Sequence, residues 1–490
     1  MKSANFLLLP LVLLVSGCFP TERIFWSPMG DRAIVIIDQR PFLATSDGKL
    51  DDHPLIGEKL NETIFTALSW LPDGSGFLAP TTRKIDRWAE VKARISPDEV
   101  AKIEALIPAT IPLLEAATSI ASDAADLQAV IKALPIQGDR RLLFAMKVAY
   151  ELNPSQVESI FTKMKHGSQL IATIRETNTP YEVNELHLVR LDAQPRDDIL
   201  FSSALKAFGL PKPSPKYPSF ACMEYAEGEE DLKLFVASLD GKQRLDLAST
   251  DVQPFFDWLP DGRELAFISS IEDDSKAIQS INTITALQTN GQPMKPKLEP
   301  QANGSLVAVE GPDRLGAQTL IATYLMGSRL AVLPDGRILF ASHVASFPSI
   351  ATDNEVSSSL HIIATDRKSI TMVPTAPGDL PADLKFFAVS PDGRHVAIVE
   401  NSTDAVAVVE LESGKTQIIS PPHPNWHCET VPAWKSSKEL TFAGLDEASK
   451  QPQWMLWSTD GSTQTLSTNW PQKLTQEWLS EKKPEPAKPE

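Results

Sequence analysis

The chain has 490 residues and a formal net charge of −17, from 63 acidic and 46 basic side chains. This length is too great for one ordinary compact core but suits an array of repeated units. A surface this acidic repels phosphate backbones, and no run rich in Lys or Arg offsets it, so the composition argues against nucleic-acid binding.

The first eighteen residues are typical of an export signal. Lys2 supplies a positive charge, residues 6–15 form an apolar run, and Val15-Ser16-Gly17-Cys18 follows. The run is too short to span a bilayer as a helix, but it has the length of a secretory signal's apolar core. The four residues ending at Cys18 resemble the lipobox of bacterial lipoproteins. The resemblance implies removal of residues 1–17 and acylation of Cys18, and Phe19 favours the outer membrane. The alternative is an ordinary cleaved signal followed by an accidental Cys.

A short phrase returns along the chain: an apolar residue or Trp, then Pro-Asp-Gly, then an apolar run. In such a turn Pro presets φ, Asp can bond back to the backbone and Gly accepts a positive φ, so each copy predicts a β-hairpin. Clear copies contain Asp73, Asp261, Asp335 and Asp392, and weaker copies begin at Trp26 and Trp434. Because the turn itself needs an Asp-Gly pair, we interpret these Asp residues as scaffold and not as a carboxylate site.

The spacing of the phrase predicts an all-β fold, a β-propeller of about seven four-stranded blades, with six or eight also possible. The units are expected at approximately 22–60, 64–200, 215–250, 252–300, 302–378, 382–420 and 428–470. The repeat resembles the WD40-like propeller repeat of TolB and related periplasmic proteins. The resemblance implies a propeller over residues 18–470 and leaves the activity open, because one fold serves many functions.

Three segments depart from the repeat. A helical insertion is expected at 91–166 within the second blade, where Ser96-Pro-Asp-Glu99 forms a capping box and further helices are predicted at 112–134, 139–152 and 153–167. Strand alternation is expected to resume at 170–174. Residues 211–218 contain four prolines and predict a stiff linker, and residues 471–490 predict a disordered tail rich in Pro, Lys and Glu.

The sequence indicates no catalytic residue, no cofactor and no metal site. It contains neither the Gly-x-Ser-x-Gly elbow of serine hydrolases nor a phosphate-binding Gly-rich loop. His423 and His427 lie four residues apart beside Cys428, but the neighbouring prolines argue against the helix that would place both on one face. Cys222 and Cys428 could pair in an exported chain or remain buried thiols, and both possibilities stay open.

The leading hypothesis is a non-enzymatic, protein-binding scaffold of the bacterial cell envelope, anchored through Cys18 and facing the periplasm from the outer membrane. It would bind an envelope protein or a cell-wall partner through one face of the ring, the helical insertion or both. The alternative is a propeller that binds a small ligand or catalyses a reaction at the mouth of its central channel. In that case polar residues with perturbed pKa values would converge there.

Overall fold

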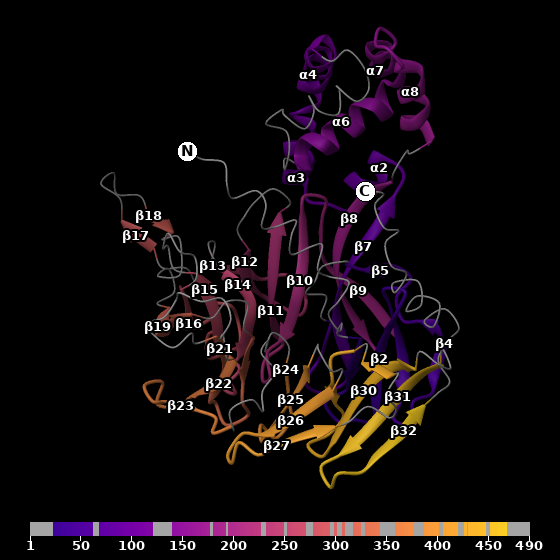
Figure 1. Cartoon of the computed structure of the whole chain (residues 1–490). Helices are drawn as coiled ribbons and strands as arrows, with labels where there is room; N and C mark the ends of the chain where they lie inside the picture. The colour runs from indigo at the N-terminus through magenta and orange to yellow at the C-terminus, as the bar shows by residue number, and fades with distance from the viewer. Residues whose placement is uncertain are drawn as a thin grey trace, which may run out of the picture.

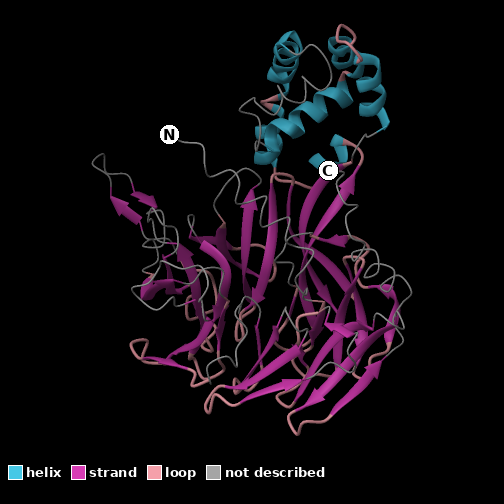
Figure 2. Ribbon diagram, viewed as in Figure 1, coloured by secondary structure: helices cyan, strands magenta, loops and turns pink. Residues whose placement is uncertain are grey.

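The structure is a computed structural model. It describes residues 23–61, 68–120, 140–176, 180–192, 195–226, 232–248, 252–270, 278–294, 298–300, 306–308, 317–324, 329–343, 358–375, 387–400, 405–419, 426–428, 430–446 and 451–467. In these ranges the strands form seven successive antiparallel sheets of four or five strands and one two-stranded hairpin. The chain is a seven-bladed β-propeller with a small helical part (Figures 1 and 2), which confirms the predicted fold.

The first three blades take up the N-terminal half of the chain. Blade 1 consists of β1 (Ile24–Trp26), β2 (Arg32–Ile37), β3 (Arg40–Thr45) and β4 (Leu50–Pro54). Blade 2 consists of β5 (Lys59–Leu60), β6 (Ser69–Trp70), β7 (Gly76–Ile85), β8 (Tyr181–Arg190) and β9 (Arg196–Ser203). Blade 3 consists of β10 (Lys206–Pro213), β11 (Ser219–Ala226), β12 (Lys233–Ser238) and β13 (Arg244–Ala248).

The other four blades follow in the same order. Blade 4 consists of β14 (Val252–Trp258), β15 (Glu264–Ser270), β16 (Ile278–Thr285) and β19 (Gln318–Tyr324), and the hairpin β17 (Leu298–Pro300) and β18 (Leu306–Ala308) precedes its last strand. Blade 5 consists of β20 (Leu330–Val332), β21 (Ile338–His343), β22 (Ser358–Ile363) and β23 (Ile370–Met372). Blade 6 consists of β24 (Phe387–Val389), β25 (His395–Glu400), β26 (Ala405–Glu410) and β27 (Thr416–Ile419). Blade 7 consists of β28 (Trp426–Cys428), β29 (Ala433–Trp434), β30 (Glu439–Asp446), β31 (Gln451–Ser458) and β32 (Thr463–Ser467).

The repeated Asp residues close the turns between the first and second strands. In each turn the Asp carboxylate accepts the N–H two residues on, at 2.9 Å for Asp73 and Asp261, 3.1 Å for Asp335 and 3.2 Å for Asp392. The glycine that follows has a positive φ, +71° at Gly262. There a Cβ would lie 2.8 Å from Ser214 Oγ of the preceding blade. The turn therefore needs glycine both for its positive φ and for the close approach of this neighbour. The interpretation of these Asp residues as turn chemistry is confirmed.

The hydrophobic core lies between blades. Seven clusters of buried side chains each join two neighbouring blades, including blade 7 and blade 1. The Trp residues of the repeat add a hydrogen bond across four of these interfaces. The indole N–H groups of Trp70, Trp258 and Trp434 donate to the carbonyls of Phe25, Lys212 and Ala388, at 2.8, 2.8 and 2.9 Å. Trp26 donates to Thr441 Oγ1 at 2.7 Å and so ties the first blade to the last.

Three expected boundaries were wrong. β5 belongs to the second blade, because Lys59 pairs with Thr82 of β7. Blade 4 extends to Tyr324, because its fourth strand is β19. The expected linker at 211–218 is the end of β10 and the turn into β11. Its prolines fit because the β10–β11 pairing shifts register between Gly209 and Lys212, a bulge that needs no ladder hydrogen bond from Pro211.

A helical subdomain lies between β7 and β8 (Figure 1), and its helices are cyan in Figure 2. Its described helices are α2 (Trp88–Lys92), α3 (Pro97–Glu104), α4 (Ile107–Ile120), α6 (Arg140–Leu152), α7 (Pro154–Phe161) and α8 (Gly167–Glu176), so they begin before residue 91 and end after residue 166. α4 begins before Pro112, and the strand expected at 170–174 is part of α8. A short apolar run has no period that separates helix from strand, which explains the second error.

The capping box at the start of α3 is only half formed. Ser96 Oγ accepts the N–H of Glu99 at 3.2 Å, as the sequence predicts. The Glu99 carboxylate points instead to the ring, where it accepts the hydroxyl of Ser203 and the N–H of Ala204. Burial raises the pKa of Glu99 despite these hydrogen bonds. The residue therefore joins the subdomain to the connection between blades 2 and 3.

Candidate functional site

The ring has two different faces. Because strands alternate in direction, the turns between first and second strands and between third and fourth strands lie on one face, which we call the turn face. The helical subdomain connects the second and third strands of blade 2, so it lies on the opposite face, which we call the helical face (Figure 1). β1 begins at Ile24 on the helical face, since the turn that follows it contacts the turn of blade 2 at Pro28 and Gly74.

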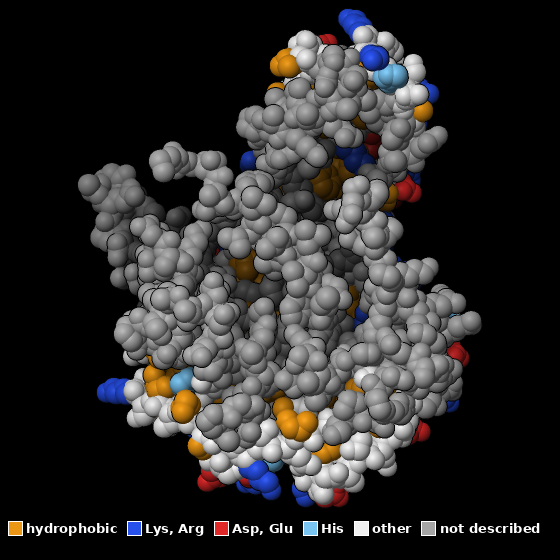
Figure 3. Space-filling view, viewed as in Figure 1, with side chains coloured by type: hydrophobic (Ala, Val, Ile, Leu, Met, Phe, Trp, Pro, Cys, Tyr) orange, Lys and Arg blue, Asp and Glu red, His pale blue; other side chains and the backbone are white. Residues whose placement is uncertain are grey.

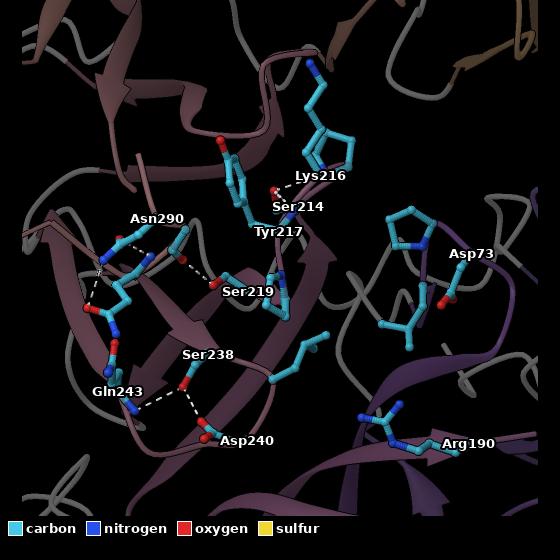
Figure 4. Close-up of a pocket in the computed structure, with 17 residues that line it drawn as sticks. Asp73, Arg190, Ser214, Lys216, Tyr217, Ser219, Ser238, Asp240, Gln243 and Asn290 are labelled. Carbon is cyan, nitrogen blue, oxygen red and sulfur yellow. Dashed lines mark hydrogen bonds between the residues drawn. The ribbon is translucent and has the colours of Figure 1, made fainter. Parts of the chain in front are cut away.

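The larger cavity, of about 730 Å³, lies on the turn face between blades 2, 3 and 4 (Figure 4). Turns of the three blades surround it. Its lining consists of Leu71, Pro72, Asp73, Arg190, Ser214, Pro215, Lys216, Tyr217, Pro218, Ser219, Ser238, Leu239, Asp240, Gln243, Asn290, Gly291 and Gln292. It combines proline and aromatic surface with amide and charged side chains, a composition typical of binding pockets.

The proline-rich turn of blade 3 forms one wall of this pocket and is held by hydrogen bonds to blade 4. Ser214 Oγ donates to the Gly262 carbonyl at 2.7 Å, and Ser219 Oγ donates to the Gly291 carbonyl at 2.9 Å. The N–H of Tyr217 donates to Ser214 Oγ at 3.3 Å. The prolines restrict the backbone further, so Tyr217 is presented from a preformed turn.

The charged groups of the pocket differ in how they are satisfied. Asp73 accepts the N–H and the hydroxyl of Ser75, at 2.9 and 2.7 Å, and these bonds lower its pKa. A hydrogen bond from Ser238 lowers the pKa of Asp240 in the same way. Arg190 points into the pocket from the end of β8 (Figure 4). Its Nε is buried and has no hydrogen-bond partner among the described residues.

A second cavity, of about 400 Å³, lies at the axis of the ring, because residues of the innermost strands of six blades line it. Its charged lining residues are Lys212, Asp257 and Arg329. Lys212 Nζ lies 3.3 Å from Asp257 Oδ1, and the other oxygen of Asp257 accepts the N–H of Val332 at 3.0 Å. Asp257 thus connects blades 3, 4 and 5. The contacts of this carboxylate with Lys212 and Val332 stabilise the ring.

A buried ionic cluster lies in blade 2 beneath the helical subdomain. His187 Nδ1 is 2.7 Å from Asp197 Oδ1, and its Nε2 is 3.3 Å from Glu185 Oε2. Glu185 also contacts Arg83 at 2.9 Å and, from the subdomain, Arg94 at 3.2 Å. Burial alone would lower the pKa of His187, but the contacts with Asp197 and Glu185 outweigh it and raise the pKa to about 9. The cluster seats the subdomain on the ring.

The residues singled out from the sequence do not form a common site. Cys18 and His423 lie outside the described residues. Cys222 is in blade 3 and Cys428 is in blade 7, both buried, and no disulfide joins them. Burial raises the pKa of the Cys222 thiol. Within the described ranges no three His, Cys, Asp or Glu side chains come together as metal ligands.

Sequence reasoning missed the turn-face pocket. One signal was present: the proline-rich turn of blade 3 follows the Asp73 turn by one blade, and consecutive blades are neighbours. The position of Arg190 gave no such signal, because it lies at the end of β8, which the helical subdomain separates in sequence from β7.

No family model matches the chain, and no curated protein matches it. Among solved structures it is similar to a putative TolB from Agrobacterium tumefaciens, with 15% identity and a TM-score of 0.35 over 56% of this chain and 84% of that one. It is also similar to an oligogalacturonate lyase in complex with manganese, with 11% identity and a TM-score of 0.40 over 81% of this chain and 76% of that one. The Cps50 (Swd1) β-propeller domain from Myceliophteria thermophila has 11% identity and a TM-score of 0.44 over 90% of this chain and 97% of that one. All three TM-scores are below 0.5, so these similarities do not identify the fold or the function. The seven-bladed β-propeller follows from the seven successive sheets of this chain itself.

Proposed function

We propose that this protein is a non-enzymatic scaffold of the bacterial cell envelope, anchored through an acylated Cys18, which binds an extended segment of a partner protein in the turn-face pocket. The observation that carries the proposal is the pocket between blades 2, 3 and 4, into which Arg190 points with a buried Nε that has no hydrogen-bond partner among the described residues. The anchor and the envelope location are supported by the lipobox-like sequence ending at Cys18.

The lining suits a polypeptide. An extended segment presents alternating backbone donors and acceptors, and the side-chain amides of Gln243, Asn290 and Gln292 can pair with both kinds of group. The ring of Tyr217 and the prolines beside it offer rigid apolar contact to side chains of the segment. Arg190 would pair with a carboxylate of the partner, because a guanidinium binds a carboxylate through two parallel hydrogen bonds.

The carboxylates of the pocket are poorly suited to act as general acids. A general acid needs a pKa near the working pH, so that it holds a proton to donate. The pKa values of Asp73 and Asp240 are lowered by hydrogen bonds within their own turns. Both side chains are therefore ionised acceptors, and neither is available as a proton donor at neutral pH.

A site-specific photo-crosslinker tests the proposal in living cells. We expect a crosslinker at Gln243, in the pocket, to capture one partner that a crosslinker at Ser413, exposed on the same face at blade 6, does not capture. Arg190→Gln should reduce the Gln243 crosslink at least about tenfold, because a hydrogen bond to a charged group contributes about 1.5–3 kcal/mol. The matched variant Arg394→Gln removes a guanidinium from the same face outside the pocket and should leave the crosslink intact. Equal capture from both positions, or no effect of Arg190→Gln, would contradict the proposal.

The alternative, a small ligand or a reaction at the axial cavity, has weaker support. The carboxylate at the axis, Asp257, already accepts from Val332 and Trp258 and pairs with Lys212. A ligand would have to compete with contacts that join three blades. A ligand that stabilises the protein against heat and loses this effect in Asp257→Asn would favour the alternative.

A further inference from the structure

We propose that the partner segment continues from the turn-face pocket across the first turn of blade 2 and places an apolar side chain against Met29 of blade 1. The contact with Met29 rests on the proposed function and deepens it, because it gives the partner a second point of attachment and a sequence feature. The partner carries an acidic residue for Arg190 and, two or four positions away in an extended segment, an apolar residue for Met29.

Met29 lies in a turn that has the backbone of the repeated phrase but a different side chain. In the turns that contain Met29 and Asp73, the N–H of the following glycine donates to the carbonyl three residues before it, at 2.9 Å in both turns. The φ angles of these glycines, Gly30 and Gly74, are +68° and +71°. Met29 therefore occupies the position that an Asp occupies in blades 2, 4, 5 and 6, namely Asp73, Asp261, Asp335 and Asp392.

The turn itself does not explain a methionine at this position. An Asp here accepts the N–H two residues on, as Asp73 does, whereas a thioether is only a weak acceptor. Met29 is 73% exposed, so it adds little to the hydrophobic core. A single exposed apolar side chain is ordinary on a protein surface. Met29 differs because it replaces the residue that the turn favours without a gain in packing, a pattern expected at functional positions.

The turn of blade 1 lies directly against the blade 2 turn that borders the pocket. A Cβ on Gly74 would lie 3.8 Å from Cδ of Pro28, the residue before Met29. Arg32 Nη2 donates to the Gly74 carbonyl at 2.7 Å and holds the two turns together. Residues 71–73 of the same blade 2 turn line the pocket on the side of blade 3. A segment that leaves the pocket across the blade 2 turn therefore reaches Met29.

The apolar departures from the repeated phrase lie on the two sides of blade 2. Blade 1 presents Met29, and blade 3 presents Tyr217 between prolines (Figure 4). The corresponding turn of blade 7, residues 435–438, consists of Lys and Ser. The turns between β26 and β27 and between β31 and β32, at the lower edge of Figure 3, carry charged side chains. The apolar departures therefore flank blade 2 and its Arg190.

An extended segment of a protein fits this arrangement. Neighbouring blades pack as stacked sheets about 10 Å apart, and an extended chain advances about 3.3 Å for each residue. The step from Arg190 in blade 2 to Met29 in blade 1 thus takes about three residues. Side chains of an extended segment point alternately to opposite sides, so the two that face the ring are two or four positions apart. The unbranched Met side chain can adapt to the apolar side chain that meets it.

Photo-crosslinkers at two positions test the second contact in living cells. We expect a crosslinker at Met29 to capture the same partner as the crosslinker at Gln243. A crosslinker at Met372, which is 59% exposed on β23 of blade 5, should not capture it. Mass spectrometry should place the two crosslinked sites of the partner within about ten residues, since two blade spacings and the width of blade 3 separate the crosslinkers. Capture at Gln243 but not at Met29 would overturn the second contact and leave the pocket intact, whereas capture at neither would overturn both.

The substitution Met29→Asn separates binding from folding. The side-chain oxygen of Asn can accept the same N–H as that of Asp, so urea unfolding should show no loss of stability. The Gln243 crosslink should fall about 4- to 12-fold, the effect expected when a contact that covers half of a Met side chain is lost. The control Met372→Asn removes an exposed Met from blade 5 and should change the crosslink less than about twofold. An unchanged crosslink in Met29→Asn, an equal loss in both variants, or a loss of stability in Met29→Asn would overturn the inference.

Discussion

The buried His187 predicts a loss of stability in alkaline solution. Its pKa is about 9 in the folded protein and about 6.5 in an unfolded chain, because Asp197 and Glu185 favour the charged imidazolium. A group whose pKa is raised by folding stabilises the fold fully below the unfolded value, and this contribution disappears as the pH rises through the folded value. The contribution is thus present at pH 6 and lost by about pH 10. The difference between the two pKa values corresponds to a contribution of at most about 3 kcal/mol to the free energy of unfolding.

Urea unfolding at pH 6 and pH 10 measures this contribution when the native chain is compared with His187→Gln. The amide of Gln can still donate to Asp197 but does not titrate. Other titratable groups, such as Lys147, whose pKa is lowered by burial, are present in both proteins and cancel in the comparison. We expect the free energy of unfolding of the native chain to fall by about 2–3 kcal/mol more than that of the variant. If the two proteins lose stability in parallel, a charged His187 between Glu185 and Asp197 does not stabilise the fold, and the reasoning is wrong.

Three further predictions concern the ring and the proposed anchor. Trp26→Phe should lower the free energy of unfolding by about 1–3 kcal/mol, since it leaves the buried Thr441 hydroxyl without its donor, and chemical denaturation at pH 7 will show whether it does. Gly262→Ala should cost about 1–3 kcal/mol in the same assay, because its φ is positive and its Cβ would meet the neighbouring blade, whereas Gly57→Ala, with no atom within 4 Å, should not destabilise the fold. Cys18→Ser should release the protein from membranes or leave the leader uncleaved, and normal processing with unchanged membrane retention would rule out acylation at this residue.

The fold could be predicted because neighbouring residues alone determine the hairpin turns of the repeated phrase, which contain Asp73, Asp261, Asp335 and Asp392. Its turn chemistry depends on four consecutive residues, and its repetition fixes the architecture. The blade boundaries were harder to place where a blade departs from the phrase. Blade 3 has no Pro-Asp-Gly turn, and its proline-rich turn was taken for a linker.

The site could not be predicted for a different reason. Arg190, Tyr217 and Gln243 come from three strands or turns in two blades, and no local pattern indicates that they line one cavity. The capping box at Ser96 shows the same limit on a smaller scale. The start of the helix was predicted correctly. The Glu99 carboxylate, however, accepts a hydrogen bond from Ser203 of the ring, 104 positions away, and does not complete the capping box.

The hydrogen bond from Trp26 to Thr441 sets an order of assembly. The two residues are 415 positions apart, so blade 1 has to wait for nearly the whole chain before it gains its last neighbour. Until then the apolar face that later packs against Trp454 has no cover. A protein that closes its ring in this way cannot complete its fold until blade 7 has been synthesised, and contacts so distant in sequence form slowly. The first blade therefore keeps an exposed apolar face until the last blade has formed, and this face needs protection while the chain folds.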